Sequence, residues 1–182
     1  MTIPRVVCFI DSSNLFSYLR DAFGSGKYRQ GALCDAVAGP ERELVQWRFY
    51  AAVLPDGESD RQKARYEAQQ GFFKLIRSRP RGVLCLGRFL VEGEIPHQRL
   101  REKGVDVHLA VDLVRLAARD EYDVAIVMSG DEDLVPAIVA VREEHGKRVE
   151  IALPAMAQAY HVKKAADGFV DIARETFEKV GL

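Results

Sequence analysis

The sequence predicts an α/β protein: a three-layer α/β/α domain around a doubly wound, mainly parallel sheet of about five to six strands. Short apolar runs rich in β-branched residues alternate along the chain with segments whose apolar residues recur at helical spacing. These apolar runs are nearly continuous, which is typical of parallel strands that helices cover on both faces. The whole chain, residues 1–182, is expected to form this one domain.

The first half of the chain begins with a strand and a helix. Its apolar run RVVCFI stops at Asp11, and a helical pattern then continues as far as Gly24. Gly39 closes a shorter helical segment, and Pro55 ends a second apolar run. The expected elements are a strand at 5–10, a helix at 15–23, a short helix at 32–39, a strand at 45–54 and the longest helix at 59–79.

The second half repeats this alternation and leaves one segment open. Residues 94–104, EIPHQRLREKG, fit either a hairpin or a loop. Leu109, Leu113 and Leu116 have the spacing of a helical stripe. The expected elements are strands at 82–93, 122–130, 148–154 and 169–172, and helices at 107–120, 132–146 and 157–166.

Composition narrows the classes of function. Lys and Arg (26) nearly balance Asp and Glu (27), so any contact with nucleic acid must come from local patches. The three cysteines lack the spacing of zinc ligands and are odd in number, which argues against a disulfide framework. The N-terminal residues lack the pattern of a secretion signal and no apolar run has membrane-spanning length, so we expect a soluble, cytoplasmic protein without membrane contacts.

Three acids stand at predicted strand ends. Asp11 ends the first strand, and Asp131 and Asp133 follow the strand at 122–130. Ligands of open parallel sheets bind beyond the carboxyl ends of the strands, where strand order reverses, so these acids share one crevice if the two strands are neighbours. Asn14, at the start of the first helix, is placed to orient a carboxylate, a water or a phosphate oxygen.

Asp112 is a fourth candidate acid. On a helical wheel it lies beside the leucine stripe of its helix, away from Arg115 and Arg119, and therefore at the edge of the buried face. A carboxylate near burial needs a partner, which an arginine or a shared cation would supply.

Helix capping explains Asp11, Asp131 and Asp133 taken singly, because Asp is a preferred N-cap and a favourable charge at a helix N-terminus. Capping explains less well why several acids gather at strand ends with no basic residue in the same segments. Carboxylates that lie close together raise one another's pKa unless a cation intervenes. Because Mg²⁺ takes oxygen ligands and keeps several waters, the grouping favours a site for a hard divalent cation.

Three segments, VVCFIDSSNLF, KGVDVHLAVDLVRLA and DVAIVMSGDEDLVPAI, resemble in order and spacing the signature segments of the NYN domain. This family is a branch of the PIN-like nuclease superfamily that includes the bacterial LabA-like proteins. The resemblance implies a PIN-like fold and an endoribonuclease that hydrolyses RNA, preferably single-stranded, with Mg²⁺ or Mn²⁺. It implies a catalytic site of Asp11, Asn14, Asp112, Asp131 and Asp133, the four aspartates as metal ligands, and supporting roles for Ser129 and Asp106.

An acidic centre needs cations around it to hold an RNA backbone. Lysines could position phosphates, and an exposed tyrosine could stack a base. The candidate substrate-binding residues are Ser12, Arg88, Tyr160, Lys163 and Lys164, with His97 and His161 as further open candidates. Two other functions also remain open, a phosphohydrolase acting on a small nucleotide and a non-catalytic RNA- or protein-binding module, and so does assembly as a homodimer.

Overall fold

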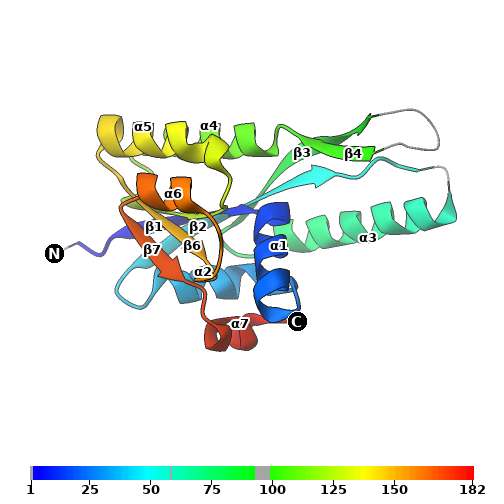
Figure 1. Ribbon diagram of the computed structural model, residues 1–182, viewed down its shortest axis with the longest axis horizontal. Helices are drawn as coiled ribbons and strands as arrows, with labels where there is room; N and C mark the ends of the chain where they lie inside the picture. The colour runs from blue at the N-terminus through cyan, green and yellow to red at the C-terminus, as the bar shows by residue number, and fades with distance from the viewer. Residues whose placement is uncertain (1, 58, 93–98) are drawn as a thin grey trace.

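Seven strands form one sheet in the computed structural model, which describes residues 2–57, 59–92 and 99–182 (Figure 1). The strands are β1 (Arg5–Asp11), β2 (Glu43–Val53), β3 (Gly82–Glu92), β4 (Arg99–Lys103), β5 (Val124–Met128), β6 (Arg148–Leu153) and β7 (Gly168–Asp171). Their order is β4-β3-β2-β1-β5-β6-β7, and β4 alone pairs antiparallel, as the return strand of a hairpin with β3.

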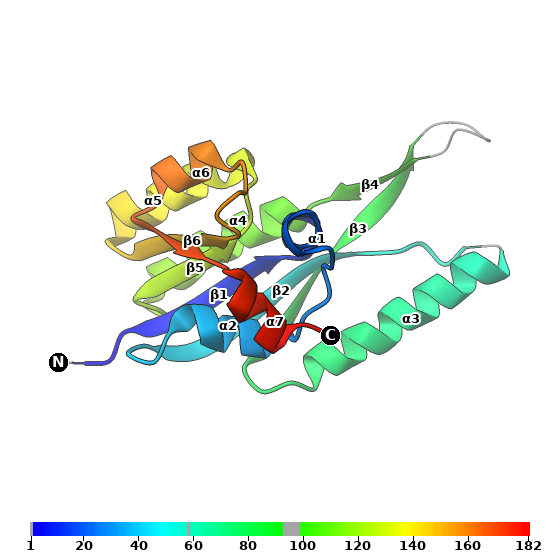
Figure 2. The same cartoon turned by 60° about the horizontal axis from the view of Figure 1, so that its bottom comes forward.

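Helices cover both faces of the sheet. Figures 1 and 2 show α4 and α5 over one face and α2 and α3 over the other. Among the described residues, no helix is both long and apolar enough to cross a membrane. The helices are α1 (Ser12–Phe23), α2 (Gln30–Ala38), α3 (Asp60–Arg77), α4 (Val105–Ala118), α5 (Val135–His145), α6 (Tyr160–Ala165) and α7 (Arg174–Val180), and a 3₁₀ turn, η1 (Glu132–Leu134), leads into α5.

Aromatic side chains fill the core on both sides of the central strands. On one face, Phe49 of β2 meets Phe72 of α3 edge-on, with ring centroids 5.6 Å apart. On the other face, Tyr50 stacks on Phe9 of β1 at 6.4 Å, and Tyr122 meets Phe9 edge-on at 5.9 Å. Residues on both faces of β1 and β2 are therefore buried, which explains their nearly continuous apolar sequences.

The strand order reverses at β1. From β1 the sheet continues through β2 and β3 on one side and through β5 and β6 on the other. Ile10 pairs with Met128, so the two strands end at the same level of the sheet. The acid-bearing strands are therefore neighbours, as a shared crevice requires.

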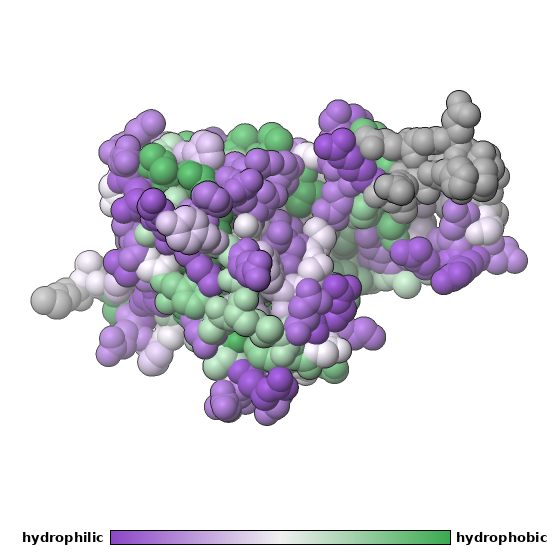
Figure 3. Space-filling view, in the orientation of Figure 1, coloured by the Kyte–Doolittle hydropathy of each residue, from purple (hydrophilic) through white to green (hydrophobic). Residues whose placement is uncertain are grey.

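The helix α3 projects from the body of the molecule (Figures 1 and 2). Its buried side chains, Phe73 and Ile76, lie in its second half. The first half begins with a capping box between Ser59 and Gln62. In the middle of the helix, the Gln69 side chain hydrogen bonds backbone groups at the end of β2. Its residues are mostly exposed, and Figure 3 shows hydrophilic side chains at this end of the molecule.

The predicted fold class is confirmed, with a different number of strands. The sheet has seven strands rather than five or six, because residues 99–103 form β4. This strand is polar and gains its conformation from pairing with β3, which no local pattern reveals. The hairpin, one of two alternatives for residues 94–104, is therefore confirmed for its described part. The helix α7 was not predicted, because its seven residues bury only Phe177 and Val180.

Two glycines allow a test of backbone packing. A Cβ on Gly87 would lie 2.8 Å from the Lys103 carbonyl oxygen and 3.1 Å from the Val105 nitrogen, so Gly87→Ala should lower the free energy of unfolding by about 1–3 kcal/mol. Gly71 lies within α3 with open space around it, so Gly71→Ala should raise the same quantity by about 0.5–1 kcal/mol. Urea unfolding monitored by circular dichroism measures both. A Gly87→Ala variant as stable as the wild type would contradict this packing.

Candidate acidic site

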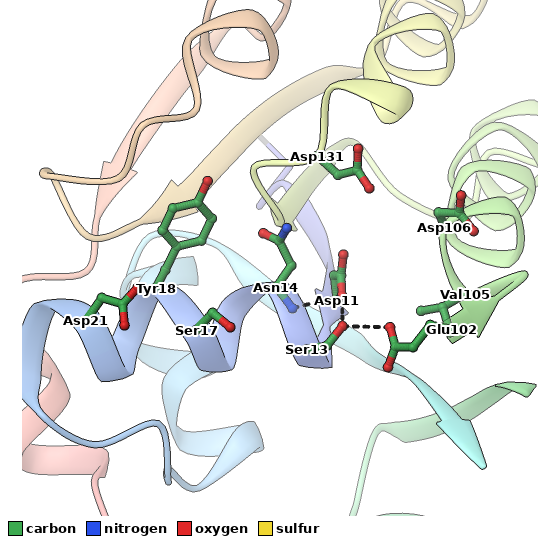
Figure 4. Close-up of a pocket in the computed structure, with 10 residues that line it drawn as sticks. All are labelled: Asp11, Ser13, Asn14, Ser17, Tyr18, Asp21, Glu102, Val105, Asp106 and Asp131. Carbon is green, nitrogen blue, oxygen red and sulfur yellow. Dashed lines mark hydrogen bonds between the residues drawn. The ribbon is translucent and has the colours of Figure 1, made fainter. Parts of the chain in front are cut away.

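A cleft of about 540 Å³ opens where β1 and β5 end (Figure 4). Its walls come from the end of β1, helix α1, the turn after β5, β4 and the first turn of α4. Of the described residues that line it, none is basic. The polar lining consists of Asp11, Ser13, Asn14, Ser17, Tyr18, Asp21, Glu102, Asp106 and Asp131.

Asp11 lies at the base of this cleft and is buried. It is the last residue of β1 and the N-cap of α1, where its Oδ1 accepts a hydrogen bond of 3.2 Å from the Asn14 backbone N–H. Its Oδ2 accepts a hydrogen bond of 3.0 Å from the hydroxyl of Ser129, which follows β5. The carboxylate is thus fixed by groups from two adjacent strand ends.

The turn after β5 is held by the same side chains. The Gly130 N–H donates to Asn14 Oδ1 at 2.8 Å, and the Asp131 N–H donates to Ser129 Oγ at 3.2 Å. A Cβ on Gly130 would lie too close to the Tyr18 hydroxyl and ring, so a larger residue here would displace the Tyr18 side chain. Asp131 then caps η1, since its Oδ1 accepts from the Asp133 N–H at 3.0 Å. The capping role considered for Asp131 is therefore real, and the same side chain lines the cleft.

The opposite wall carries two further acids. Glu102 of β4 accepts a hydrogen bond of 2.7 Å from the Ser13 hydroxyl, and Asp106 lies in the first turn of α4 (Figure 4). Sequence reasoning gave Asp106 only a supporting role and did not select Glu102. No local signal identified Glu102, because its position depends on the pairing of β4 with β3.

The electrostatic environment of Asp11 disfavours its charged form. Burial raises the pKa of Asp11 to about 6, and the negative charges of Glu102 and Asp131 act in the same direction. The hydrogen bonds from Asn14 and Ser129 oppose this rise without cancelling it. A cation in the cleft would reverse the balance, since it favours ionised carboxylates.

Asp112 does not line the cleft, although the family resemblance implied that it is a metal ligand. Its Oδ2 lies 2.7 Å from the Arg48 guanidinium and accepts a hydrogen bond of 3.0 Å from the Tyr50 hydroxyl. Its Oδ1 lies 2.6 Å from the Arg115 guanidinium. Burial raises the pKa of Asp112, but the hydrogen bond and charge of Arg48 outweigh it and leave that pKa below its ordinary value. The partner that this buried carboxylate needed is a pair of arginines.

Asp133 also lies outside the cleft. Its backbone N–H donates to the Asp131 side chain, whereas its own exposed side chain lines a neighbouring pocket with His161 and Lys164. Ser12 is partly buried and does not line the cleft. The structure therefore separates the five predicted catalytic residues: it brings Asp11, Asn14 and Asp131 together in the cleft and leaves Asp112 and Asp133 outside.

The predicted substrate-binding residues of α6 differ in whether their side chains already bind other groups of the protein. Lys163 donates a hydrogen bond of 2.9 Å to the Ala157 carbonyl and lies over the Phe169 ring at 4.2 Å, so it holds the local structure together. Tyr160 is exposed, and the Lys164 ammonium lies 5.8 Å from its ring centroid.

The remaining candidates are scattered. Arg88 is exposed on β3 and lines a separate pocket. Nε2 of His161 lies 3.6 Å from Oε2 of the Glu132 carboxylate. His97 lies outside the described residues.

The donor atoms of the cleft fit a hard divalent cation. Within the described parts of the chain, no three carboxylate, imidazole or thiolate groups converge as a complete set of metal ligands. The lining nevertheless supplies oxygen donors only, and Asp11 and Asp131 are close enough for each charge to affect the other. Mg²⁺ and Mn²⁺ bind such oxygen donors, and Mg²⁺ commonly completes its shell with water. The residues therefore fit a cation held by one or two carboxylates and several waters.

A doubly wound sheet with helices on both faces is compatible with the three-layer fold of the PIN-like nucleases. The model of the NYN domain matches residues 5–173, and the chain belongs to this family, a branch of that superfamily. No curated protein sequence matches the chain. The crystal structure of a protein of unknown function from Vibrio parahaemolyticus is similar, with a TM-score of 0.64 and 18% sequence identity over 95% of each chain. At that identity the likeness shows the fold alone.

The two buried aspartates should respond oppositely to the same substitution in metal-free buffer. Because the folded-state pKa of Asp11 is raised, its contribution to stability is present below pH 3.8 and is lost as pH rises through about 6. Asp11→Asn should therefore stabilise the protein at pH 8 by on the order of 2–3 kcal/mol, since Asn keeps the cap. The folded-state pKa of Asp112 is lowered, so its contribution is present above the ordinary value and is lost as pH falls.

Asp112→Asn should accordingly destabilise the protein at pH 8 by about 3–5 kcal/mol, because it leaves Arg48 buried without its counter-ion. Urea unfolding with EDTA, at pH 8 and near pH 4, measures both variants. The gain from Asp11→Asn should largely disappear near pH 4. Equal destabilisation by both substitutions at pH 8 would show that the two carboxylates are in similar environments.

Proposed function

We propose that the protein is a ribonuclease that hydrolyses RNA phosphodiester bonds with Mg²⁺ or Mn²⁺ in the acidic cleft. The observation that carries the proposal is the placement of Asp11 and Asp131 at two adjacent strand ends, in a cleft whose described lining contains no basic residue. Membership of a family of nuclease-like domains supports the same chemistry.

The residues of the cleft have distinct roles in this proposal. Asp11 and Asp131 hold the cation, and Asp106 and Glu102 supply further carboxylates on the opposite wall. Ser129 and Asn14 position the ligands, the first by donating to Asp11 and the second by accepting from the Gly130 N–H. When bound, a divalent cation offsets the negative charge of the scissile phosphate and makes water easier to deprotonate.

The pocket beside Asp131 suits the flanking nucleotide. Its lining combines Lys164 and His161 with the acids Glu132 and Asp133, and the exposed Tyr160 ring lies beside the two basic residues in α6. An exposed aromatic ring with a nearby lysine is the combination that stacks a base and holds its phosphate.

The metal requirement gives the main test. Purified protein treated with EDTA should leave a labelled single-stranded RNA intact, and added Mn²⁺ or Mg²⁺ should restore cleavage. Asp131→Asn should lower the cleavage rate by on the order of 10²-fold or more, because it removes one charge from the metal site. Glu144→Gln, which removes an exposed carboxylate from the far end of α5, should cleave as the wild type does.

Other outcomes of that assay would contradict the proposal. Cleavage that survives EDTA and Asp131→Asn would place the activity elsewhere. Hydrolysis of free nucleotides without cleavage of RNA would indicate a small-molecule phosphohydrolase. Binding of RNA without turnover in either metal would indicate a non-catalytic module.

The two lysines of α6 should behave differently when replaced by glutamine. Lys164→Gln should weaken RNA binding and flatten its dependence on salt, because this exposed lysine has no acidic partner among the described residues. Lys163→Gln should mainly lower the melting temperature, because its ammonium group already binds the Ala157 carbonyl and the Phe169 ring. Fluorescence anisotropy at several salt concentrations and thermal melts separate the two effects. The same salt slope for Lys164→Gln and the wild type would remove Lys164 from the RNA path.

A further inference from the structure

A second, basic pocket of about 400 Å³ lies on the other side of the segment that forms one wall of the acidic cleft. Arg88 of β3, Lys103 of β4 and His108 of α4 line it, together with two glycines. All three side chains are exposed. No acidic side chain is among the described residues of its lining, so the pocket is suited to an anion.

The arginine and the lysine of this pocket face each other across the hairpin. Arg88 and Lys103 are register partners in the antiparallel pair of β3 and β4. Side chains of directly opposite residues lie on the same face with Cβ atoms about 5 Å apart, and like charges at such positions destabilise the pair. An anion between them would remove this repulsion.

Neither of these adjacent cations has an ion-pair partner among the described residues, although acids lie elsewhere on the surface. Some other arginines of the chain are neutralised by nearby acids through direct hydrogen bonds. Examples are Arg5 with Asp123, Arg42 with Glu150, and Arg142 with Asp167. Charges that remain unpaired at adjacent positions are therefore available to an external ligand.

The chain segment 102–108 separates the two sites. Glu102 and Asp106 line the acidic cleft, whereas Lys103 and His108 line the basic pocket. Gly87 permits this arrangement, because the backbone at Lys103 approaches it too closely for a side chain. A polyanion lying in the acidic cleft would reach the basic pocket by crossing this one segment, on the wall opposite the turn that carries Asp131 (Figure 4).

We propose that Arg88, Lys103 and His108 form a phosphate-binding subsite that holds the RNA backbone next to the acidic cleft. The inference rests on the proposed ribonuclease function for its ligand. The subsite defines a path for the substrate, which runs from the pocket beside α6, past Asp131 and Asp106, to the β3–β4 hairpin. The substrate class is an oligonucleotide long enough to cover both positions, rather than a single nucleotide.

The test compares two pairs of charge-removing substitutions. One variant is Arg88→Gln with Lys103→Gln, and its matched control is Lys27→Gln with Lys179→Gln, which removes two exposed lysines that have no side-chain partners among the described residues. Binding of a fluorescein-labelled oligouridylate of about 12 nucleotides is measured in EDTA at several salt concentrations. The slope of log affinity against log salt should become shallower by about 1.4 for the subsite variant, since each phosphate contact contributes about 0.7 in a single strand. The control should keep the wild-type slope.

Two further measurements keep the test decisive. Thermal melts should show that the subsite variant folds at least as well as the wild type, because it removes a like-charge pair. If it does not fold, Arg88→Gln alone, a single exposed change, replaces it and should make the slope shallower by about 0.7. Hydrolysis of bis(p-nitrophenyl) phosphate with Mn²⁺ should be unchanged in the control pair, because Lys27 and Lys179 line neither the acidic cleft nor the basic pocket.

The outcomes separate the subsite from the proposed function. Metal-dependent RNA cleavage together with an unchanged slope in the subsite variant would overturn the subsite and leave the ribonuclease standing. A flattened slope in a protein that cleaves no phosphodiester would support the subsite and overturn the ribonuclease. Equal flattening by the control pair, or no binding of the oligouridylate by the wild type, would overturn the subsite.

Discussion

The hydrogen bond from Ser129 to Asp11 joins the ends of two parallel strands, and the site depends on it. Asp11 closes β1 and Ser129 follows β5, which lies beside β1 where the strand order reverses. Asn14 adds a second link through the Gly130 N–H. With both links in place, the position of the Asp131 carboxylate follows from the register of two buried strands. The fold therefore sets this geometry before any ligand arrives.

The two buried aspartates of the chain's acidic set, Asp11 and Asp112, have different surroundings. Asp112 is neutralised internally by Arg48 and Arg115, and the result is a rigid link between α4 and β2. Asp11 accepts only hydrogen bonds from neutral groups and lies near other acids. The first arrangement stabilises the folded chain by itself, whereas the second leaves a buried carboxylate whose charge no basic group of the described lining offsets.

Sequence patterns located the parts of the site that depend on local structure. Asp11 and Asp131 follow apolar strands directly, so their place at the carboxyl edge of the sheet was readable from the chain. The wheel of α4 showed that Asp112 lies near the buried face, but its partner Arg48 is 64 residues away and belongs to another element. Glu102 escaped notice because the conformation of β4 comes from its partner strand. The pairing of strands and side chains that are far apart in the sequence could not be predicted. This pairing determines which acids line the cleft.

The two outer strands of the sheet also limit how copies of the protein can meet. One edge is β4, five residues long with Arg101, Glu102 and Lys103 at its end, and the other is β7, four residues long and ending in Asp171. Short, charged edge strands present few unpaired backbone groups in line and resist the addition of a foreign strand. A continuous sheet shared between two molecules is therefore disfavoured at both edges of this sheet.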